Sequence, residues 1–325
     1  CDAEGKYCAA LADVQIMTTK DEAIHVQNVV KRFGDFTAVD GVSFTVHRGE
    51  IFGILGPNGA GKTTILEIIE GLQNPTTGQT TVLNFDTRRD ANKVKENIGV
   101  QLQASAYFEY LTLIEILRLF GRFYQKQTDP MRLLEKVGLT EKAMATVGSL
   151  SGGQRQRFII AAALVNDPEV VFLDEPTTGL DPQARQNLWG FIREMHAEGR
   201  TIILTTHYME EAQLLCHRVA IMDHGKIVAL DSPANLVRGL PVPYQIKFAA
   251  STNGLAEELM EVDSVQGVNV DPEGIYHLRS SDAAATLQGL FARADVKRIQ
   301  LSHIEVTPTD LEEVFLTLTG RQLRD

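Results

Sequence analysis

The chain has 325 residues, a formal net charge of −11 and a hydrophobic fraction of 44%. That length accommodates one large domain and a smaller one, each with its own core. The acidic balance argues against a general nucleic-acid-binding protein, which needs a basic surface to neutralise phosphates. No stretch approaches the roughly 18 consecutive apolar residues of a membrane span, so a membrane role is expected to come through a partner chain.

Residues 1–20 are expected to form a disordered tail, because Met17 is a more natural start than Cys1. The three cysteines, Cys1, Cys8 and Cys216, have neither the spacing of a metal site nor an even count for disulfide pairing. This cysteine usage favours a reducing compartment such as the cytoplasm.

The N-terminal part of the chain predicts antiparallel strands that lead into a buried strand. Segments 24–33 and 36–50 are typical of the antiparallel strands, and the apolar run Ile51 to Leu55 indicates a strand buried on both faces. A helix is expected at 63–72. The glycine-rich segment before it therefore lies between a buried strand and a helix.

The middle of the chain predicts a helical insert followed by an α/β core. A capping box at Thr112 and Glu115 marks the start of a helix, and the insert is expected over about 104–165. The elements expected next are strands at 169–175 and 201–207, a crossover helix at 183–199 and a hairpin at 218–230. Strand, helix and strand in this order imply parallel pairing in an α/β sheet.

The C-terminal region predicts a second, smaller domain after a linker. The linker is expected at 231–243, which contains three prolines. The elements expected beyond it are a strand at 244–249, a helix at 254–262, two strands around the turn 271–274, a helix at 282–294, a strand at 296–305 and a final helix capped at Thr309. The first six match the βαββαβ order of ferredoxin-like domains.

The segment GPNGAGKTT satisfies the phosphate-binding pattern GxxxxGK[ST]. Its glycines let backbone N–H groups surround a di- or triphosphate, Lys62 reaches the β- and γ-phosphates, and Thr63 offers its hydroxyl to Mg²⁺. An ordinary glycine turn is the alternative, which the position between strand and helix disfavours. The residues expected to contact the nucleotide are Gly56, Pro57, Asn58, Gly59, Ala60, Gly61, Lys62, Thr63 and Thr64.

The apolar run VVFLDE ends on two carboxylates, Asp174 and Glu175. An apolar strand does not carry such charges without a cation or a reaction to serve. Asp174 is expected in the Mg²⁺ shell, and Glu175 is expected to be the general base that deprotonates the attacking water. The alternative is a solvated strand end with a turn at Pro176.

Three further residues have two open interpretations each. His207 follows a strand at its carboxyl end, where ligands bind in α/β sheets, although a lone histidine is usually a surface or capping group. Gln103 lies between the core and the helical insert and could contact Mg²⁺ or water, with Gln101 as its competitor and a plain loop glutamine as the alternative. Phe33 could stack on a purine ring or simply belong to the core.

The segment LSGGQRQR predicts a second anion site at a helix start. Ser151 is typical of an N-cap, and Gly152 and Gly153 leave backbone N–H groups open to a charged oxygen. Since the glycine-rich loop already surrounds one side of a triphosphate, this site is expected to contact ATP bound to another copy, in a twofold-symmetric dimer. A capped structural helix with Arg155 and Arg157 in solvent is the alternative.

Together these motifs resemble those of the nucleotide-binding subunits of ATP-binding cassette (ABC) transporters, over about 24–233. GPNGAGKTT resembles the Walker A motif, LSGGQ the family signature, VVFLDE the Walker B motif, TGLD the D-loop and His207 the switch histidine. The resemblance implies that Gln103 takes the Q-loop role as a catalytic and Mg²⁺-contacting residue and that Phe33 stacks on adenine. The residues that it implies on the second side of the nucleotide are Ser151, Gly152, Gly153, Gln154 and Asp181.

The implied fold is an α/β P-loop NTPase core (21–233) with an antiparallel β subdomain and a helical insert, then a linker and a small α+β domain (234–325). The implied function is an ATPase that uses ATP and Mg²⁺, forms a homodimer around two ATP molecules and drives export through a separate integral membrane permease. The segment PTTGLDPQAR and the C-terminal segment TDLEEVFLTLTGRQLRD resemble those of the ABC-2 exporter subgroup, which implies a place on the cytoplasmic face of the membrane. No nucleic-acid partner is expected, and a soluble ABC-type ATPase acting on ribosomes or nucleic acid is the alternative.

Overall fold

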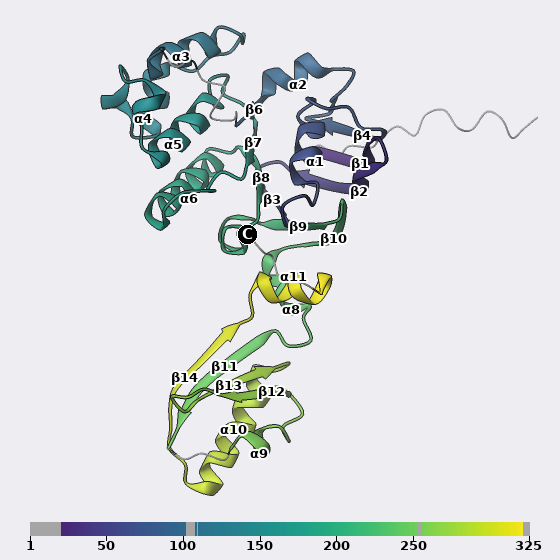
Figure 1. The fold of residues 1–325 in the computed structure, drawn as a ribbon, viewed down its shortest axis with the longest axis vertical. Helices are drawn as coiled ribbons and strands as arrows, with labels where there is room; N and C mark the ends of the chain where they lie inside the picture. The colour runs from purple at the N-terminus through teal and green to yellow at the C-terminus, as the bar shows by residue number, and fades with distance from the viewer. Residues whose placement is uncertain (1–20, 102–107, 109, 252–254, 321–325) are drawn as a thin grey trace, which may run out of the picture.

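The structure is a computed structural model, and it describes residues 21–101, 108, 110–251 and 255–320 (Figure 1). The expected tail at 1–20 and the residue Gln103 lie outside this part of the chain. Figure 1 shows an elongated molecule, with the larger α/β part at one end and a small sheet with two helices at the other. No helix among the described residues is long and apolar enough to cross a membrane.

The centre of the larger part is a six-stranded sheet in the order β10-β9-β3-β8-β7-β6. Its strands are β3 (Ile51–Leu55), β6 (Ile98–Val100), β7 (Val170–Asp174), β8 (Thr201–Thr206), β9 (Arg218–Asp223) and β10 (Lys226–Asp231). All neighbours pair in parallel except β10, which forms the predicted hairpin with β9. Alternate β3 residues point into two different cores, Ile51 and Leu55 into one and Phe52 and Ile54 into the other. Burial on both faces explains the uninterrupted apolar run.

One face of this sheet packs on an antiparallel sheet in the order β2-β1-β4-β5. Its strands are β1 (Glu22–Phe33), β2 (Phe36–His47), β4 (Thr77–Val82) and β5 (Phe85–Asp86). The helix α1 (Lys62–Ile69) lies between the sheets, where Ile65 and Ile69 share a core with Phe44 of β2 and Phe52 of β3. The antiparallel β subdomain is therefore confirmed.

The other face carries the helices of the insert and the crossover. The elements are α3 (Leu113–Gly121), α4 (Pro130–Lys136), two short 3₁₀ turns (Thr140–Lys142 and Val147–Ser149), α5 (Gly152–Ala162), α6 (Pro182–Ala197) and α7 (Met209–Leu215), whereas α2 (Ala91–Asn97), before β6, buries Val94 in the core on the side of the antiparallel sheet. The capping box of α3 is confirmed, since Thr112 N donates to Glu115 Oε2 at 2.8 Å and Glu115 N donates to Thr112 Oγ1 at 3.4 Å.

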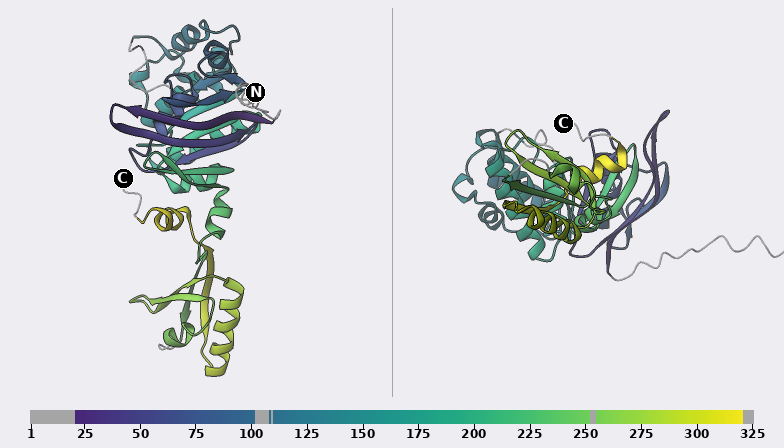
Figure 2. Two further views of the ribbon diagram at one scale, coloured as in Figure 1. Left: turned by 90° about the vertical axis from the view of Figure 1, so that its right-hand side faces the viewer. Right: turned by 90° about the horizontal axis from the view of Figure 1, so that it is seen from below.

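The small domain has the ferredoxin-like topology. Its elements are β11 (Tyr244–Ala250), α9 (Ala256–Leu259), β12 (Val265–Val270), β13 (Ile275–Ser280), α10 (Ala283–Lys297) and β14 (Leu301–Pro308). The antiparallel sheet has the order β12-β13-β11-β14, and Figure 2 shows α10 along one face of it. Phe248 and Tyr276 stack in its core with ring centroids 4.9 Å apart.

Three C-terminal predictions are wrong in detail. The linker at 231–243 contains a helix, α8 (Pro233–Arg238), because Pro233 occupies the first turn, where a missing N–H costs nothing, and Ser232 caps it. The strand expected at 296–305 is β14, which starts at Leu301 because α10 continues to Lys297.

The final helix, α11 (Leu311–Thr319), is capped by Asp310 rather than by the predicted Thr309. The Asp310 carboxylate accepts from Glu312 N at 3.0 Å, whereas the Thr309 hydroxyl donates to Val242 O at 3.0 Å. Thr309 therefore ties the start of α11 to the segment before β11.

The helix α11 returns from the small domain to the larger part. Leu311, Val314 and Phe315 are buried in the same core as Leu215 of α7 and Val237 of α8. The domain boundary between 233 and 234 stays a prediction, but the last helix of the chain packs into the core of the larger domain.

We expect Phe315→Ala to lower the free energy of unfolding of the larger domain by about 3–5 kcal/mol, because it empties a fully buried site. Leu318→Ala on the same helix is the matched control, since Leu318 is 45% exposed and its loss should cost less than about 0.5 kcal/mol. Urea titrations of the full chain compare the two. Equal, small effects would show that α11 does not contribute to that core.

Candidate functional site

The candidate site lies where three neighbouring parallel strands end. In register, Leu55 of β3 pairs with Thr206 of β8, and Thr205 of β8 pairs with Asp174 of β7. The segments that follow these strands are the glycine-rich loop, the turn at Glu175 and the turn at His207. Parallel pairing therefore brings all three to one edge of the sheet.

The glycine-rich loop needs glycine at two positions for steric reasons. A Cβ on Gly56 would lie 2.3 Å from Met222 O, and a Cβ on Gly61, whose φ is 99°, would lie 2.4 Å from Ala38 O. Gly61 is also the N-cap of α1 and provides no side-chain cap. The first N–H groups of α1 therefore face the loop without a side-chain acceptor, as an anion-binding helix start requires.

Lys62 is buried, and its ammonium group has a complete set of oxygen partners. The Nζ atom donates to Gly56 O at 2.9 Å and to Pro57 O at 3.2 Å, and it lies 3.1 Å from Glu175 Oε1. These contacts hold the Lys62 ammonium group between the glycine-rich loop and the residue that follows β7.

Glu175 contacts both Lys62 and His207. Its Oε2 atom lies 3.1 Å from His207 Nδ1, and its backbone has a φ of 45°, which a residue other than glycine rarely adopts. Burial by itself raises the pKa of Glu175, but the hydrogen bonds and charges of Lys62 and His207 outweigh it and hold the pKa below its ordinary value. The carboxylate is therefore ionised at neutral pH.

Asp174 lies beside the start of α1. Thr63 Oγ1 donates to Asp174 Oδ2 at 3.1 Å, and Thr205 Oγ1 donates to Asp174 Oδ1. Among the residues that the structure describes, no group of three or more His, Cys, Asp or Glu side chains could hold a metal by itself. A hydroxyl and a carboxylate side by side suit Mg²⁺, which usually completes its shell with water and substrate phosphates.

Gln101 contacts the site directly, and the competition with Gln103 stays open. Gln101 Nε2 donates to the backbone oxygen of Asp174 at 3.0 Å, while its Oε1 is buried without a hydrogen-bond partner among the described residues. This amide links β6, beside the helical insert, to the end of β7. Gln101, the predicted competitor of Gln103, is therefore in direct contact with the site.

The signature segment begins a helix, as predicted. Ser151 caps α5 in a reciprocal box, since its Oγ accepts from Gln154 N at 3.3 Å and Gln154 Oε1 accepts from Ser151 N at 3.1 Å. Gly152 is exposed and Gly153 half-buried. Because Ser151 Oγ accepts this bond, its own hydrogen stays free to donate to an anion. Figure 1 shows α5 and α1 on opposite sides of the central strands.

Asp181 and Phe33, which are also predicted to contact the nucleotide, lie away from the three strand ends. Asp181 caps α6, with its carboxylate accepting from Ala184 N at 2.8 Å. Phe33 ends β1 and is 48% exposed, with Lys31 Nζ 4.9 Å from its ring centroid, so the interpretation as a core residue is wrong. Sequence reasoning missed Thr205, because it is one of three threonines in the strand TIILTT and nothing in the sequence sets it apart.

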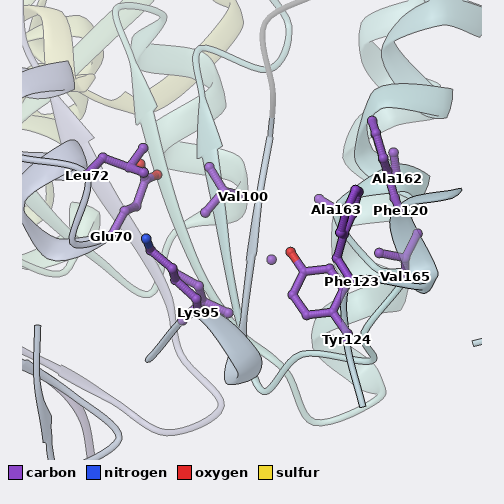
Figure 3. A pocket seen from close by; sticks show the side chains of 12 residues that line it. Glu70, Leu72, Lys95, Val100, Phe120, Phe123, Tyr124, Ala162, Ala163 and Val165 are labelled. Carbon is purple, nitrogen blue, oxygen red and sulfur yellow. The ribbon is translucent and has the colours of Figure 1, made fainter. Parts of the chain in front are cut away.

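A groove of about 310 Å³ opens between the sheet and the helical insert (Figure 3). Figure 3 shows Glu70, Lys95 and Val100 on one wall and Phe120, Phe123 and Tyr124 on the other. Burial, followed by the charges of Asp174 and Glu67, raises the pKa of Glu70 to about 8. The side chains that line the groove are mostly apolar. Its one acidic side chain, Glu70, is largely protonated at neutral pH.

Comparisons with known proteins agree with this geometry. A family model described as ABC transporter matches residues 39–178. The chain is 40% identical to the Nod factor export ATP-binding protein I of Rhizobium sp. (strain N33), over 93% of this chain and 98% of the relative. It is 36% identical to the linearmycin resistance ATP-binding protein LnrL of Bacillus subtilis (strain 168), over 93% of this chain and 100% of the relative.

Solved structures match the same fold. The ATP-binding subunit of an ABC transporter superposes with a TM-score of 0.60 at 26% identity, over 66% of this chain and 92% of that one. A dimeric cassette in a post-hydrolysis state with ADP and phosphate superposes with a TM-score of 0.58 at 26% identity, over 64% of this chain and 98% of that one. The chain therefore belongs to the ABC transporter family, as an ATP-binding and ATP-hydrolysing subunit of the exporter type.

The raised pKa of Glu70 predicts a pH-dependent stability. The unfolded chain releases this proton near pH 4.5 and the folded chain near pH 8, so the folded state holds the extra proton between those values. The contribution of protonated Glu70 to stability is therefore fully present below about pH 4.5 and is lost as the pH rises to about 8. Glu70→Gln should be more stable than the parent chain at about pH 8.5, and the difference should shrink toward about pH 5.

Urea titrations across this pH range measure the effect, with the exposed Glu96→Gln on α2 as the control that should follow the parent chain. A constant difference between Glu70→Gln and the parent at every pH would contradict the assignment of the titrating group.

Proposed function

We propose that this subunit forms a homodimer around two ATP molecules and drives export through a separate ABC-2 type membrane permease. The observation that carries the proposal is the contact of Lys62, Glu175 and His207 at one edge of the sheet. The relatives are named for Nod factor export and for linearmycin resistance, which supports an exporter. The same names and the net charge of −11 disfavour a ribosomal or nucleic-acid role.

In this proposal, Glu175 is the general base of hydrolysis. When ATP binds, the γ-phosphate oxygens would replace the Glu175 carboxylate as a partner of the Lys62 ammonium group. The Glu175 carboxylate is then free to accept a proton from the attacking water. Losing the contact with Lys62 also removes a cause that lowers the pKa of Glu175, so the carboxylate becomes a stronger base. His207 then bridges Glu175 and the γ-phosphate, and a Gln101 or Gln103 amide orients the water.

Mg²⁺ would be held by Thr63 and Asp174, with Gln103 as a further candidate. The Thr63 hydroxyl and the Asp174 carboxylate already lie 3.1 Å apart, so no rearrangement is needed to bring two hard oxygen ligands together. When bound, the ion neutralises charge that develops on the phosphates. Phe33, exposed at the end of β1, would stack on the adenine ring, and the remaining loop residues from Gly56 to Thr64 would surround the phosphates.

The second half of each nucleotide site would come from the partner copy. Ser151, with its free hydroxyl hydrogen, and the first N–H groups of α5 form an anion-binding helix start. A head-to-tail pair of copies with twofold symmetry would place this helix start against the γ-phosphate held by the other copy's loop, and Asp181 would line the same interface. The closed site then needs both chains.

The groove beside Glu70 would receive a segment of the membrane permease. It lies between the sheet and the helical insert, so an occupant would contact both parts. A segment docked there would hold this subunit at the cytoplasmic face of the membrane. The exported molecule would contact the permease rather than this chain.

We expect Glu175→Gln to bind ATP but to lose turnover by about 10²–10⁴-fold, because it removes the general base and keeps the size of the side chain. Glu169→Gln, six residues earlier and exposed, is the control that should keep full turnover. Steady-state ATPase assays and equilibrium ATP titrations separate the two effects. A near-normal rate in Glu175→Gln would reject the assignment.

We also expect ATP with Mg²⁺ to convert Glu175→Gln from monomer to dimer on a sizing column, whereas ADP should not, because ADP lacks the γ-phosphate. Adding Ser151→Asp should block this shift by setting an acid against that phosphate, while ATP binding to the loop stays largely intact. Ser149→Asp, two residues earlier and also exposed, is the charge-matched control and should still dimerise. Dimers of the Ser151→Asp variant would show that LSGGQ is not part of the site.

A further inference from the structure

The tyrosine that follows His207 in the chain contacts the histidine ring. The ring centroids of His207 and Tyr208 lie 4.2 Å apart, and the two ring planes are tilted by 44°. Aromatic rings at this separation attract each other in addition to the effect of the area that they bury. Tyr208 therefore belongs to the immediate surroundings of His207.

The Tyr208 ring also carries a cation, which comes from α6. The central guanidinium carbon of Arg185 lies 4.3 Å from the Tyr208 ring centroid, within the range of a cation–π contact. Arg185 Nε is buried and has no hydrogen-bond partner among the residues that the structure describes. The guanidinium is therefore held over the ring and not by a hydrogen bond at that nitrogen.

The backbone anchors Tyr208 between β8 and α7. Tyr208 is the N-cap residue of α7, and its backbone N–H donates to Thr206 Oγ1 at 2.9 Å. Its carbonyl oxygen accepts from Ala212 N at 3.2 Å, in the first turn of the helix. Thr206 is the last residue of β8 and is buried. The Tyr208 side chain therefore starts from a backbone that is fixed on both sides.

A second contact holds α6 against α7, about one turn further along both helices. Trp189 Nε1 of α6 donates to Glu211 Oε1 of α7 at 3.0 Å, and Glu211 is fully buried. Arg185 and Trp189 are four residues apart and therefore lie on one face of α6. Glu211 follows Tyr208 by three residues. The buried hydrogen bond therefore fixes the spacing of the two helices next to the contact between Arg185 and Tyr208.

The contact with Glu175 alone does not determine the plane of the His207 ring. Glu175 Oε2 lies 3.1 Å from one atom of that ring, Nδ1. A contact at one atom lets the ring turn about that atom. Such a turn moves the other ring nitrogen, Nε2, away from the position that the proposed function gives to the γ-phosphate. A contact with the ring itself, such as that of Tyr208, removes this freedom.

We infer that Tyr208 is a positioning residue for ATP hydrolysis, which holds the His207 ring so that Nδ1 faces Glu175 while Nε2 faces the γ-phosphate. Arg185 holds the Tyr208 ring in turn. This inference rests on the proposed function of His207. In this role Tyr208 neither contacts the nucleotide nor takes up a proton. A displacement of about 1 Å in a reacting group can cost about 10²-fold in rate, so the effect is large enough to measure.

Tyr208→Leu removes the ring and keeps an apolar side chain. We expect unchanged ATP affinity and KM, because the glycine-rich loop is untouched, and a kcat lower by at least about tenfold. Tyr208→Phe keeps the ring and should keep most of the kcat. Equilibrium ATP titrations and steady-state ATPase assays of the full chain measure both quantities.

Arg185→Met tests the same contact from α6. The Tyr208 ring stays but loses its cation, so kcat should fall by a smaller factor, again with unchanged ATP affinity. If Tyr208→Leu does not fold, this variant decides the question. An unchanged kcat in Arg185→Met would then overturn the inference.

Phe85→Leu is the matched control for stability. Phe85 of β5 also has a cation on its ring, since Lys93 Nζ lies 5.2 Å from the ring centroid, but it packs against the core beside the antiparallel sheet. Both Leu variants should lower the melting temperature, and only Tyr208→Leu should lower kcat. Equal losses of kcat in the two variants would assign the effect to general destabilisation and overturn the inference.

A double-mutant cycle tests whether Tyr208 acts through His207. His207→Ala should lower kcat, and adding Tyr208→Leu should lower it no further, because the ring that Tyr208 orients is gone. Normal turnover in His207→Ala would overturn the proposed function itself. Three results would overturn only this inference: normal kcat in Tyr208→Leu beside a low kcat in His207→Ala, a loss in Tyr208→Phe as large as that in Tyr208→Leu, or additive losses in the double variant.

Discussion

The contact between Lys62 and Glu175 depends on the parallel pairing of β3, β8 and β7, and the rest of the site depends on that contact. Parallel strands end at the same edge of a sheet, so the glycine-rich loop, the acidic turn and the histidine turn meet there although the sequence separates them widely. The left-handed backbone of Glu175 turns its side chain toward Lys62 and His207 at once. Burial of the sheet on both faces keeps these strand ends in register.

The sequence correctly predicted the strands and helices that are specified by a pattern within one short segment. Continuous apolar runs identified β3, β7 and β8, because a strand buried on both faces has no polar alternation, and capping residues identified the starts of α3 and α5. The helix α8 was missed because a proline in the first turn of a helix looks like a proline in a linker. Thr205 and Glu211 were missed because the role of a buried polar side chain depends on the residues that surround it. Those residues come from other segments, and the sequence does not show which segments meet.

The nucleotide site and the groove are electrostatically connected through the sheet. The charge of Asp174, beside the nucleotide loop, is one cause of the raised pKa of Glu70 in the groove. The helix α11 reaches the same domain from the C-terminal end and packs against α7, which carries Glu211.

The central claim, that each ATP is hydrolysed between two copies of this chain, is tested most directly by mixing two inactive variants. Lys62→Ala lacks a working phosphate loop, and Ser151→Asp lacks a working signature helix. In a mixed dimer, the intact loop of the Ser151→Asp copy faces the intact helix start of the Lys62→Ala copy, which completes one site. The account predicts ATPase activity in the mixture that neither variant shows alone. A mixture that stays as inactive as its parts, although mixed dimers form, would contradict it.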